Sequence, residues 1–306
     1  MTSRGGRQAG RGPGSVGERR LPVREIARRR RLWAGGEPGP PWYACLCRFG
    51  IATAGNAGLF AWMKAFVGSV FANWPRPVIV YDLGLKGDQK AALLERGVRV
   101  CGVPPHLMRR QALFARRPWF LLASTFRYTL FLDATCLVLR PIPEVEEAVR
   151  NGELSVCGDG EHDVASRCSP GIAAFYGVPH EELKGIPAFD EGVIGLSPDK
   201  HACFLSRWYE GGMAYHKIRG DGAFRDRGPA NVAWYSLHKA PPALRPQDLY
   251  NNASAAPDSD AAIVRLPPSA CDASSEWRPV VERFEKAFDM SPTTPQTTEK
   301  EIRSAN

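Results

Sequence analysis

The sequence lacks a long apolar run. None of its segments reaches the roughly 18 consecutive apolar residues that a membrane-spanning helix needs, and its basic N-terminus is not followed by the apolar core of a secretory signal peptide. Cysteine occurs eight times but never as a Cys-x-x-Cys pair, and Cys45 and Cys47 have no nearby residues that complete a zinc site. These absences argue against a spanning helix and a zinc module, and they predict a reduced, cytoplasmic protein.

Acidic residues are scarce at the N-terminus. Residues 1–41 hold ten arginines and three glutamates, which is +7 of the chain's net charge of +8. This segment predicts a disordered basic tail. A patch for nucleic acid or anionic lipid is the alternative, but no aromatic side chains alternate with the arginines, so nucleic acid is the less favoured partner. The remaining boundaries are a single domain at 42–287 and a polar C-terminal tail at 288–306.

Apolar segments alternate between strand-like and helix-like spacing in the first third of the domain. Such an alternation predicts an α/β protein with a parallel sheet and right-handed crossovers. The predicted elements are strands at 43–49, 77–82 and 98–101 and helices at 58–72 and 87–96. Further along, we expect helices at 109–125, 143–150, 200–209, 226–237 and 276–288, strands at 153–157, 190–197 and 261–266, and a polar loop at 158–163.

One carboxylate interrupts the most apolar part of the chain. Apolar runs enter Asp133 from Tyr128 and leave it through Leu139. Burying an unpaired carboxylate is costly, and ligands of open α/β sheets bind beyond the carboxyl ends of the strands. Asp133 is therefore a candidate site residue. The alternative is an ordinary turn residue between two hairpin strands.

Four stretches, taken in order, resemble a bacterial glycosyltransferase of the GT-A, nucleotide-diphospho-sugar fold. Residues 127–141 are similar to that family's leucine-aspartate-x-aspartate segment, and residues 189–196 to its phenylalanine-asparagine-x-glycine-valine strand. Residues 78–85 resemble its second strand and turn, and residues 226–231, followed by 244–251, its aspartate-glutamine helix and the turn after it. The resemblance covers roughly residues 42–266 and implies a Rossmann-type, mixed but mainly parallel sheet flanked by helices.

The resemblance implies sugar transfer from a nucleotide-diphosphate sugar to an acceptor hydroxyl. Metal-dependent members hold Mn²⁺ or Mg²⁺ against the diphosphate with two aspartates, one residue apart. Here Asp133 is the first of them, but Thr135 stands at the second position, and Arg265 follows the late strand where a histidine or glycine is often found. An arginine can hold a diphosphate directly. The two departures predict weak or absent metal dependence, and a site that has lost activity is the alternative.

The resemblance also implies roles for other residues. Asp82, Arg116 and Arg117 would face the nucleotide. The alternative for Asp82 is that it only ends a strand, and the alternative for the two arginines is that they begin a solvated helix. Asp190 and Glu191 would contact the sugar or the acceptor, one of them as a general base. Asp226 would bind the acceptor or sugar, with Asn231 positioning it; a helix N-cap is the alternative for Asp226. The nucleotide-sugar site thus comprises Asp82, Arg116, Arg117, Asp133, Thr135, Asn231 and Arg265, and the catalytic candidates are Asp190, Glu191 and Asp226.

The partners implied are a UDP- or GDP-sugar donor and a glycan, lipid or protein acceptor. A peripheral position at the inner membrane is compatible with this interpretation. Two other functions compete with it. The first is an inactive GT-A-like domain that binds a nucleotide sugar or glycan, and the second is a protein that associates with nucleic acid through its arginine-rich tail.

Overall fold

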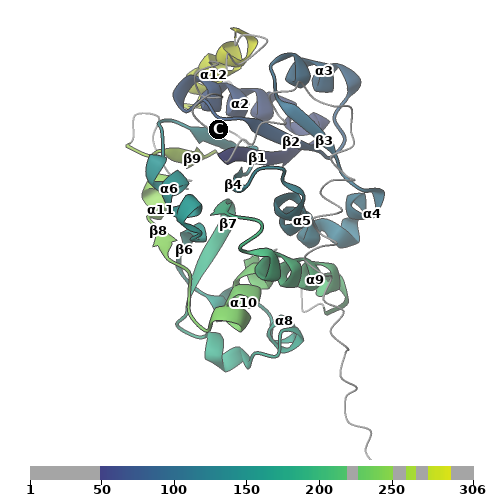
Figure 1. Ribbon diagram of the computed structural model, residues 1–306, viewed down its shortest axis with the longest axis vertical. Coiled ribbons are helices and arrows are strands. Elements are labelled where there is room, and N and C mark those ends of the chain that lie inside the picture. The colour runs from purple at the N-terminus through teal and green to yellow at the C-terminus, as the bar shows by residue number, and fades with distance from the viewer. Residues whose placement is uncertain (1–48, 219–226, 251–259, 267–274, 291–306) are drawn as a thin grey trace, which may run out of the picture.

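The computed structural model describes residues 49–218, 227–250, 260–266 and 275–290 (Figure 1). The basic tail predicted at 1–41 and most of the strand predicted at 43–49 lie outside these ranges. Strand β1 (Phe49–Gly55) begins where that predicted strand ends. None of the helices in the described ranges combines the length and hydropathy required to cross a membrane.

A seven-stranded sheet organises the chain in the order β3-β2-β1-β4-β7-β6-β8. The pairs β3–β2, β2–β1, β1–β4 and β6–β8 are parallel, whereas β7 runs antiparallel to both β4 and β6. The predicted mixed, mainly parallel sheet is therefore confirmed. Besides β1, its strands are β2 (Val78–Asp82), β3 (Arg99–Gly102), β4 (Tyr128–Leu132), β6 (Ser155–Asp163), β7 (Pro187–Leu196) and β8 (Leu244–Arg245).

Strands β5 (Cys136–Val138) and β9 (Ile263–Arg265) form a separate antiparallel pair. The apolar segment around Asp133 is thus neither one continuous strand nor a hairpin, because β4 and β5 belong to different sheets. The backbone turns between them, and the N–H of Cys136 donates to the carbonyl of Asp133 at 2.9 Å. Asp133 therefore lies at the junction of the two sheets.

Helices cover both faces of the large sheet (Figure 1). On one face lie α2 (Phe60–Asn73), α3 (Gly87–Glu95), α6 (Pro143–Asn151) and α12 (Arg278–Met290), and on the other α5 (Arg116–Ala123), α9 (Ala202–Ile218) and α10 (Arg227–His238). The shorter elements are η2 (Ala57–Leu59), α4 (Pro105–Met108), η3 (Arg110–Ala115), α7 (Val164–Arg167), α8 (Pro170–Phe175), η4 (His180–Leu183) and α11 (Gln247–Tyr250).

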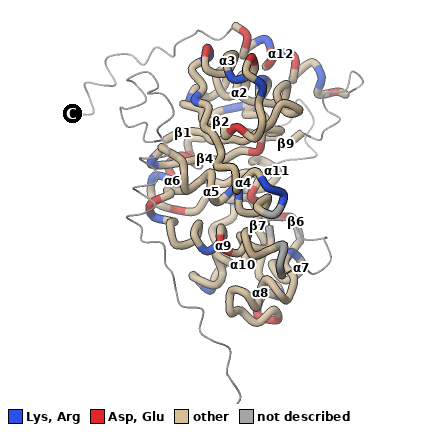
Figure 2. The backbone as a smooth tube through the Cα atoms, turned by 90° about the vertical axis from the view of Figure 1, so that its right-hand side faces the viewer, with Lys and Arg blue, Asp and Glu red and all other residues tan. Residues whose placement is uncertain are grey.

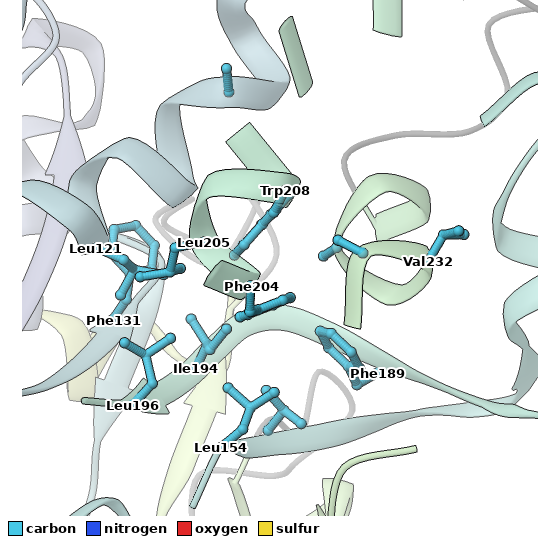
Figure 3. Close-up of a cluster of buried hydrophobic side chains, with 14 of the residues drawn as sticks. Leu121, Phe131, Leu154, Phe189, Ile194, Leu196, Phe204, Leu205, Trp208 and Val232 are labelled. Carbon is cyan, nitrogen blue, oxygen red and sulfur yellow. The ribbon is translucent and has the colours of Figure 1, made fainter. Parts of the chain in front are cut away.

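The alternation of side chains along each strand divides the core into two layers. In β4, Leu130 and Leu132 pack on the α2 face, whereas Phe131 faces α5 and α9. Phe131 there joins Ile194, Phe204 and other side chains from β7 and α9 (Figure 3). Because β4 is buried on both faces, its sequence is continuously apolar rather than alternating.

Charges of both signs occur from the end of the molecule that carries α3 and α12 to the end that carries α8 (Figure 2). The described part of the chain thus has no division into one basic and one acidic half. This distribution agrees with a nearly neutral body, whose net charge is +1 once the tail is set apart.

Three predicted boundaries were wrong. Residues 158–163 are not a loop but the second half of β6, which pairs with β7 through two register shifts. Asp163, the last of these residues, accepts from the N–H groups of Ser166 and Gly185. Helix α9 continues to Ile218, nine residues past the predicted end. Helix α12 runs to Met290 with Phe288 buried, two residues past the helix end predicted at 288.

Candidate functional site

The position of Asp133 follows from the way β4 ends. Strand β4 is buried throughout, and its last residue, Leu132, pairs with Val193 of β7. One step further, the N–H of Asp133 donates to the carbonyl of Gly192 at 3.0 Å. After the turn, Cys136 of β5 pairs with Arg265 of β9. The turn thus brings the carboxylate of Asp133 against β7 on one side and β9 on the other.

Five charged side chains from four segments meet at this junction and form what we term the acid–arginine cluster. Arg117 of α5 donates through Nη2 to Asp133 Oδ1 at 2.7 Å, and its Nη1 lies 3.7 Å from Glu191 Oε2. Arg265 of β9 places Nη2 3.3 Å from Asp133 Oδ2 and donates through Nη1 to Asp190 Oδ2 at 2.9 Å. The two guanidiniums therefore bracket Asp133.

The cluster is layered by depth. The side chains of Asp190 and Glu191 are 5% and 1% exposed, whereas those of Arg117, Asp133 and Arg265 are 18%, 19% and 30% exposed. Carboxylates at such depth are stable only when cations or hydrogen-bond donors meet them. The buried acids therefore form the floor, and the side chain of Arg265 is the most exposed of the five.

Electrostatics within the cluster hold Arg265 in its charged form. Burial works to lower the pKa of its guanidinium, but the neighbouring Asp190 and Asp133 together outweigh burial and raise the pKa above its ordinary value. Beside it, burial and, secondarily, the charge of Asp133 raise the pKa of the Cys136 thiol far above its usual range. Cys136 is thus an inert apolar residue.

Gly192 makes the convergence possible. A Cβ at this position would lie 2.9 Å from Arg265 Nη1, 3.1 Å from Asp133 Oδ2 and 3.1 Å from Asp190 Oδ1. The N–H of Gly192 also donates to Asp190 Oδ1 at 2.7 Å. Its missing side chain therefore leaves room for one guanidinium and two carboxylates at a single point.

The residues present do not fit a divalent cation of the kind that the Asp-x-Asp pattern implies. Each carboxylate oxygen of Asp133 already lies against a guanidinium, and Thr135 adds no charge. In the described ranges no three His, Cys, Asp or Glu side chains are arranged to hold a metal ion. Cationic nitrogens stand where a metal would need bare oxygen ligands.

Two of the predicted nucleotide contacts, Asp82 and Arg116, are not among the five side chains of the acid–arginine cluster. Asp82, at the end of β2, accepts the N–H groups of Gly84 and Leu85 and pairs with Lys90 at 2.9 Å. Arg116 donates to the backbone carbonyls of residues 107–109 and so anchors the segment before α5. Both residues help to build the fold, and neighbouring Arg117 is the one that reaches the cluster.

Asn231 supports the site from behind. Its side chain is buried in α10; its Oδ1 accepts the N–H of Phe189, and its Nδ2 donates to the carbonyl of the same residue, each at 2.9 Å. This pair of hydrogen bonds fixes β7 at the residue next to Asp190. Asp226, the third catalytic candidate, lies outside the described residues.

An irregularity in β7 explains why two adjacent acids serve one cluster. Between Val156 and Cys157 of β6, the paired residue of β7 moves from Ile194 to Asp190. The residues between them, which include Glu191 and Gly192, form a bulge, a device common beside active sites. In a regular strand, alternation would place the side chains of Asp190 and Glu191 on opposite faces of the sheet. The one sign in the sequence that this strand is irregular is the glycine that follows the two acids, Gly192.

A separate cavity of about 600 Å³ lies away from the cluster. Its lining comes from the segment before β6, the beginning of α9 and the end of α10, and it includes His201, Trp234 and His238. It shares no residue with the acid–arginine cluster. Because β7 runs from Asp190 toward Leu196 and α9, this cavity lies beyond the opposite end of that strand.

No family model matches the sequence, and no curated protein matches it. Among solved structures, the galactosyltransferase LgtC in complex with donor and acceptor sugar analogues is similar with a TM-score of 0.53 and 16% identity, over 84% of this chain and 99% of that one. An active-site mutant of LgtC gives 0.52 and 18%, over 80% and 97%. The apo bifunctional glycosyltransferase WbbM gives 0.56 and 10%, over 81% of this chain and 52% of that one.

These likenesses show the fold. The chain has the GT-A-type α/β fold that the resemblance implied. At these identities the substrates of the neighbours cannot be assigned to this chain. The roles of its residues have to be argued from its own side chains.

Proposed function

We propose that this protein is a glycosyltransferase that moves a sugar from a nucleotide-diphosphate sugar to an acceptor hydroxyl. The observation that carries the proposal is the acid–arginine cluster, which lies at the carboxyl end of β4 in a GT-A-type fold. Clefts at this edge are where open α/β sheets bind ligands. One structural neighbour is described in complex with donor and acceptor sugar analogues.

The reaction breaks the bond between the anomeric carbon and the β-phosphate oxygen, and the bonding electrons leave with the nucleoside diphosphate. A new bond forms between the anomeric carbon and the acceptor oxygen, whose proton passes to a carboxylate. Asp190 is the cluster's candidate for that carboxylate because its Oδ2 lies 2.9 Å from Nη1 of Arg265, the most exposed side chain of the cluster. Glu191 is buried beneath Arg117 and acts by positioning it. Asp226 remains a proposed acceptor contact.

On this proposal the donor is a UDP- or GDP-sugar and the acceptor a glycan, lipid or protein. Asp82 and Arg116 shape the nucleotide end of the site through the turns that they hold. Dependence on Mn²⁺ or Mg²⁺ is weak or absent, because Thr135 stands at the position of the second aspartate and Arg265 stands where a histidine or glycine is often found. The domain, from about residue 42 to the end of α12, works in the cytoplasm, and the basic tail at 1–41 is dispensable for donor binding.

A second candidate function has one observation in its favour. Both oxygens of Asp133 are held by guanidiniums, as expected of a domain that binds a nucleotide sugar without turning it over. The two candidates differ in turnover, not in binding.

A thermal-shift screen tests the proposal. The full chain is mixed with UDP-, GDP-, dTDP- and CMP-sugars, each with Mn²⁺ and with EDTA. A donor at about 100 times its dissociation constant should stabilise the fold by roughly 2.7 kcal/mol, a shift of several degrees. Release of nucleoside diphosphate from the stabilising donor then separates the transferase from the inactive binder. No shift with any donor under either condition would contradict both.

A further inference from the structure

We infer that Arg265 and Arg117 bind the donor diphosphate directly in place of a divalent cation, in competition with the carboxylates that hold them in the free protein. The inference rests on the proposed function and deepens it. It assigns to two side chains the charge neutralisation for which related folds use a metal. It also predicts that Asp190 opposes diphosphate binding, an effect that can be measured.

Arg265 is fixed where a cation would be required. Its backbone belongs to β9, which pairs with β5 directly after the turn that carries Asp133. The next N–H, that of Leu266, donates to the carbonyl of Thr135 at 2.9 Å. The strand that brings Arg265 to the site is thereby tied to the position where the second aspartate is missing.

The two arginine side chains are more exposed than Asp190 and Glu191. Arg265 is the most exposed of the five side chains, and Asp190 and Glu191 lie beneath at 5% and 1% exposure. Arg117 is additionally supported by the ring of Phe131, whose centroid lies 5.5 Å from its Cζ. An incoming diphosphate therefore meets both guanidiniums before it meets the carboxylates of Asp190 and Glu191, whereas Asp133 is exposed to the same degree as Arg117.

A guanidinium suits this task because its N–H groups form a planar fork. It can keep one N–H on a carboxylate while it turns others to phosphate oxygens, and such charge-assisted bonds are among the strongest that proteins make. The carboxylates below hold the fork in place. Preorganised cations at the leaving group stabilise the charge that develops as the nucleoside diphosphate departs.

The direct contact between Arg265 and Asp190 gives the inference a counterintuitive consequence. In the free protein, Arg265 donates through Nη1 to Asp190 Oδ2 at 2.9 Å. A diphosphate must therefore compete with Asp190 for Arg265. Removing the charge of Asp190 should strengthen diphosphate binding. If Asp190 or Asp133 instead held a metal, the same change would weaken binding.

The test is titration calorimetry of UDP, the diphosphate probe, into the full chain with EDTA and with Mn²⁺. If UDP gives no heat, the same titrations are run with GDP. The variants are Arg265→Gln, Arg265→Lys and Asp190→Asn. The matched control is Arg76→Gln. Arg76 also pairs with an acid, Glu146, and is 35% exposed. It precedes β2 and so lies at the amino ends of the parallel strands, opposite the end that carries Asp133. Melting curves establish that each variant is folded, and Arg265→Lys preserves the test if the glutamine variant is not.

We expect the wild-type protein to bind the probe equally well in EDTA and in Mn²⁺. Arg265→Gln should weaken binding tenfold or more, Arg265→Lys should weaken it less, Asp190→Asn should tighten it severalfold, and Arg76→Gln should leave it unchanged. Binding that requires Mn²⁺ and is insensitive to Arg265→Gln, or that Asp190→Asn weakens, would overturn the inference and leave the proposed function standing. Absence of binding by both diphosphates and by every sugar donor would overturn both.

Discussion

Replacing Gly192 with alanine introduces one methyl group at the centre of the acid–arginine cluster. The added Cβ would lie 2.9 Å from Arg265 Nη1, 3.1 Å from Asp133 Oδ2 and 3.1 Å from Asp190 Oδ1. Each of these distances is shorter than an ordinary carbon contact. The methyl group is therefore accommodated only if the ends of these side chains separate.

The magnitude follows from what must move. All three clashing atoms are the ends of side chains rather than backbone, so the stability loss should fall within the roughly 1–3 kcal/mol typical of overpacking. The effect on the site should be larger than the effect on the fold. Moving Arg265 away from Gly192 lengthens its contact with Asp190, Asp133 or both, and these contacts orient its guanidinium.

Two assays on one variant measure these effects. Urea unfolding gives the change in stability, and calorimetric titration with the nucleoside diphosphate gives the change in affinity, for which we expect a loss of at least tenfold. Gly102→Ala in β3 is the matched control, because a Cβ there meets nothing within 4 Å, and it should change stability by no more than about 0.5 kcal/mol. A Gly192→Ala protein with wild-type affinity and stability would refute the packing argument.

Two further predictions concern residues outside the cluster. Asn231→Leu should destabilise the fold by about 2–4 kcal/mol, because it leaves the buried N–H and carbonyl of Phe189 without this partner; an unchanged urea midpoint would contradict this. Asp82→Asn should give a pH-dependent loss. Burial opposes the shift, but the N–H groups of Leu85 and Gly84 and the charge of Lys90 hold the pKa of Asp82 below 3.8. A carboxylate with a lowered folded-state pKa stabilises the protein above its unfolded pKa, and this stabilisation is lost as pH falls through the folded pKa. The stability difference from wild type should therefore shrink between about pH 5 and pH 2, and a constant difference would argue against it.

The alternating elements could be predicted because their patterns are local. Strand β2 is a short, continuously apolar run that ends at Asp82, and the helix predicted at 87–96 appears as α3. Propensity and periodicity also located Asp133 at the end of a buried strand. The polar second half of β6 could not be recognised, because its pairing with β7 depends on two register shifts that sequence spacing does not encode.

The site was only partly predictable for a related reason. The sequence drew attention to Arg117, Asp133, Asp190, Glu191 and Arg265 separately, and the structure brings all five together. Their pairing arises from the junction of two sheets and from the bulge in β7, which are tertiary features. The involvement of Gly192 depends on distances that become visible only when the strands are assembled.

Asn231 and Arg116 show the limit of a motif-based assignment. Their positions match the resemblance, yet their polar atoms bond to backbone groups of Phe189 and of residues 107–109. Sequence motifs identify polar residues near a site, but they do not distinguish residues that face a ligand from residues that hold the strand or helix beneath it.

The most direct test is a crystal structure of the full chain with its stabilising nucleotide sugar in the presence of Mn²⁺, with anomalous scattering recorded for manganese. We predict that diphosphate oxygens lie about 2.7–2.9 Å from guanidinium nitrogens of Arg265 and Arg117, with no manganese peak between Asp133 and the diphosphate. A manganese ion bound by Asp133 and the diphosphate, or a nucleotide bound away from the acid–arginine cluster, would contradict the account.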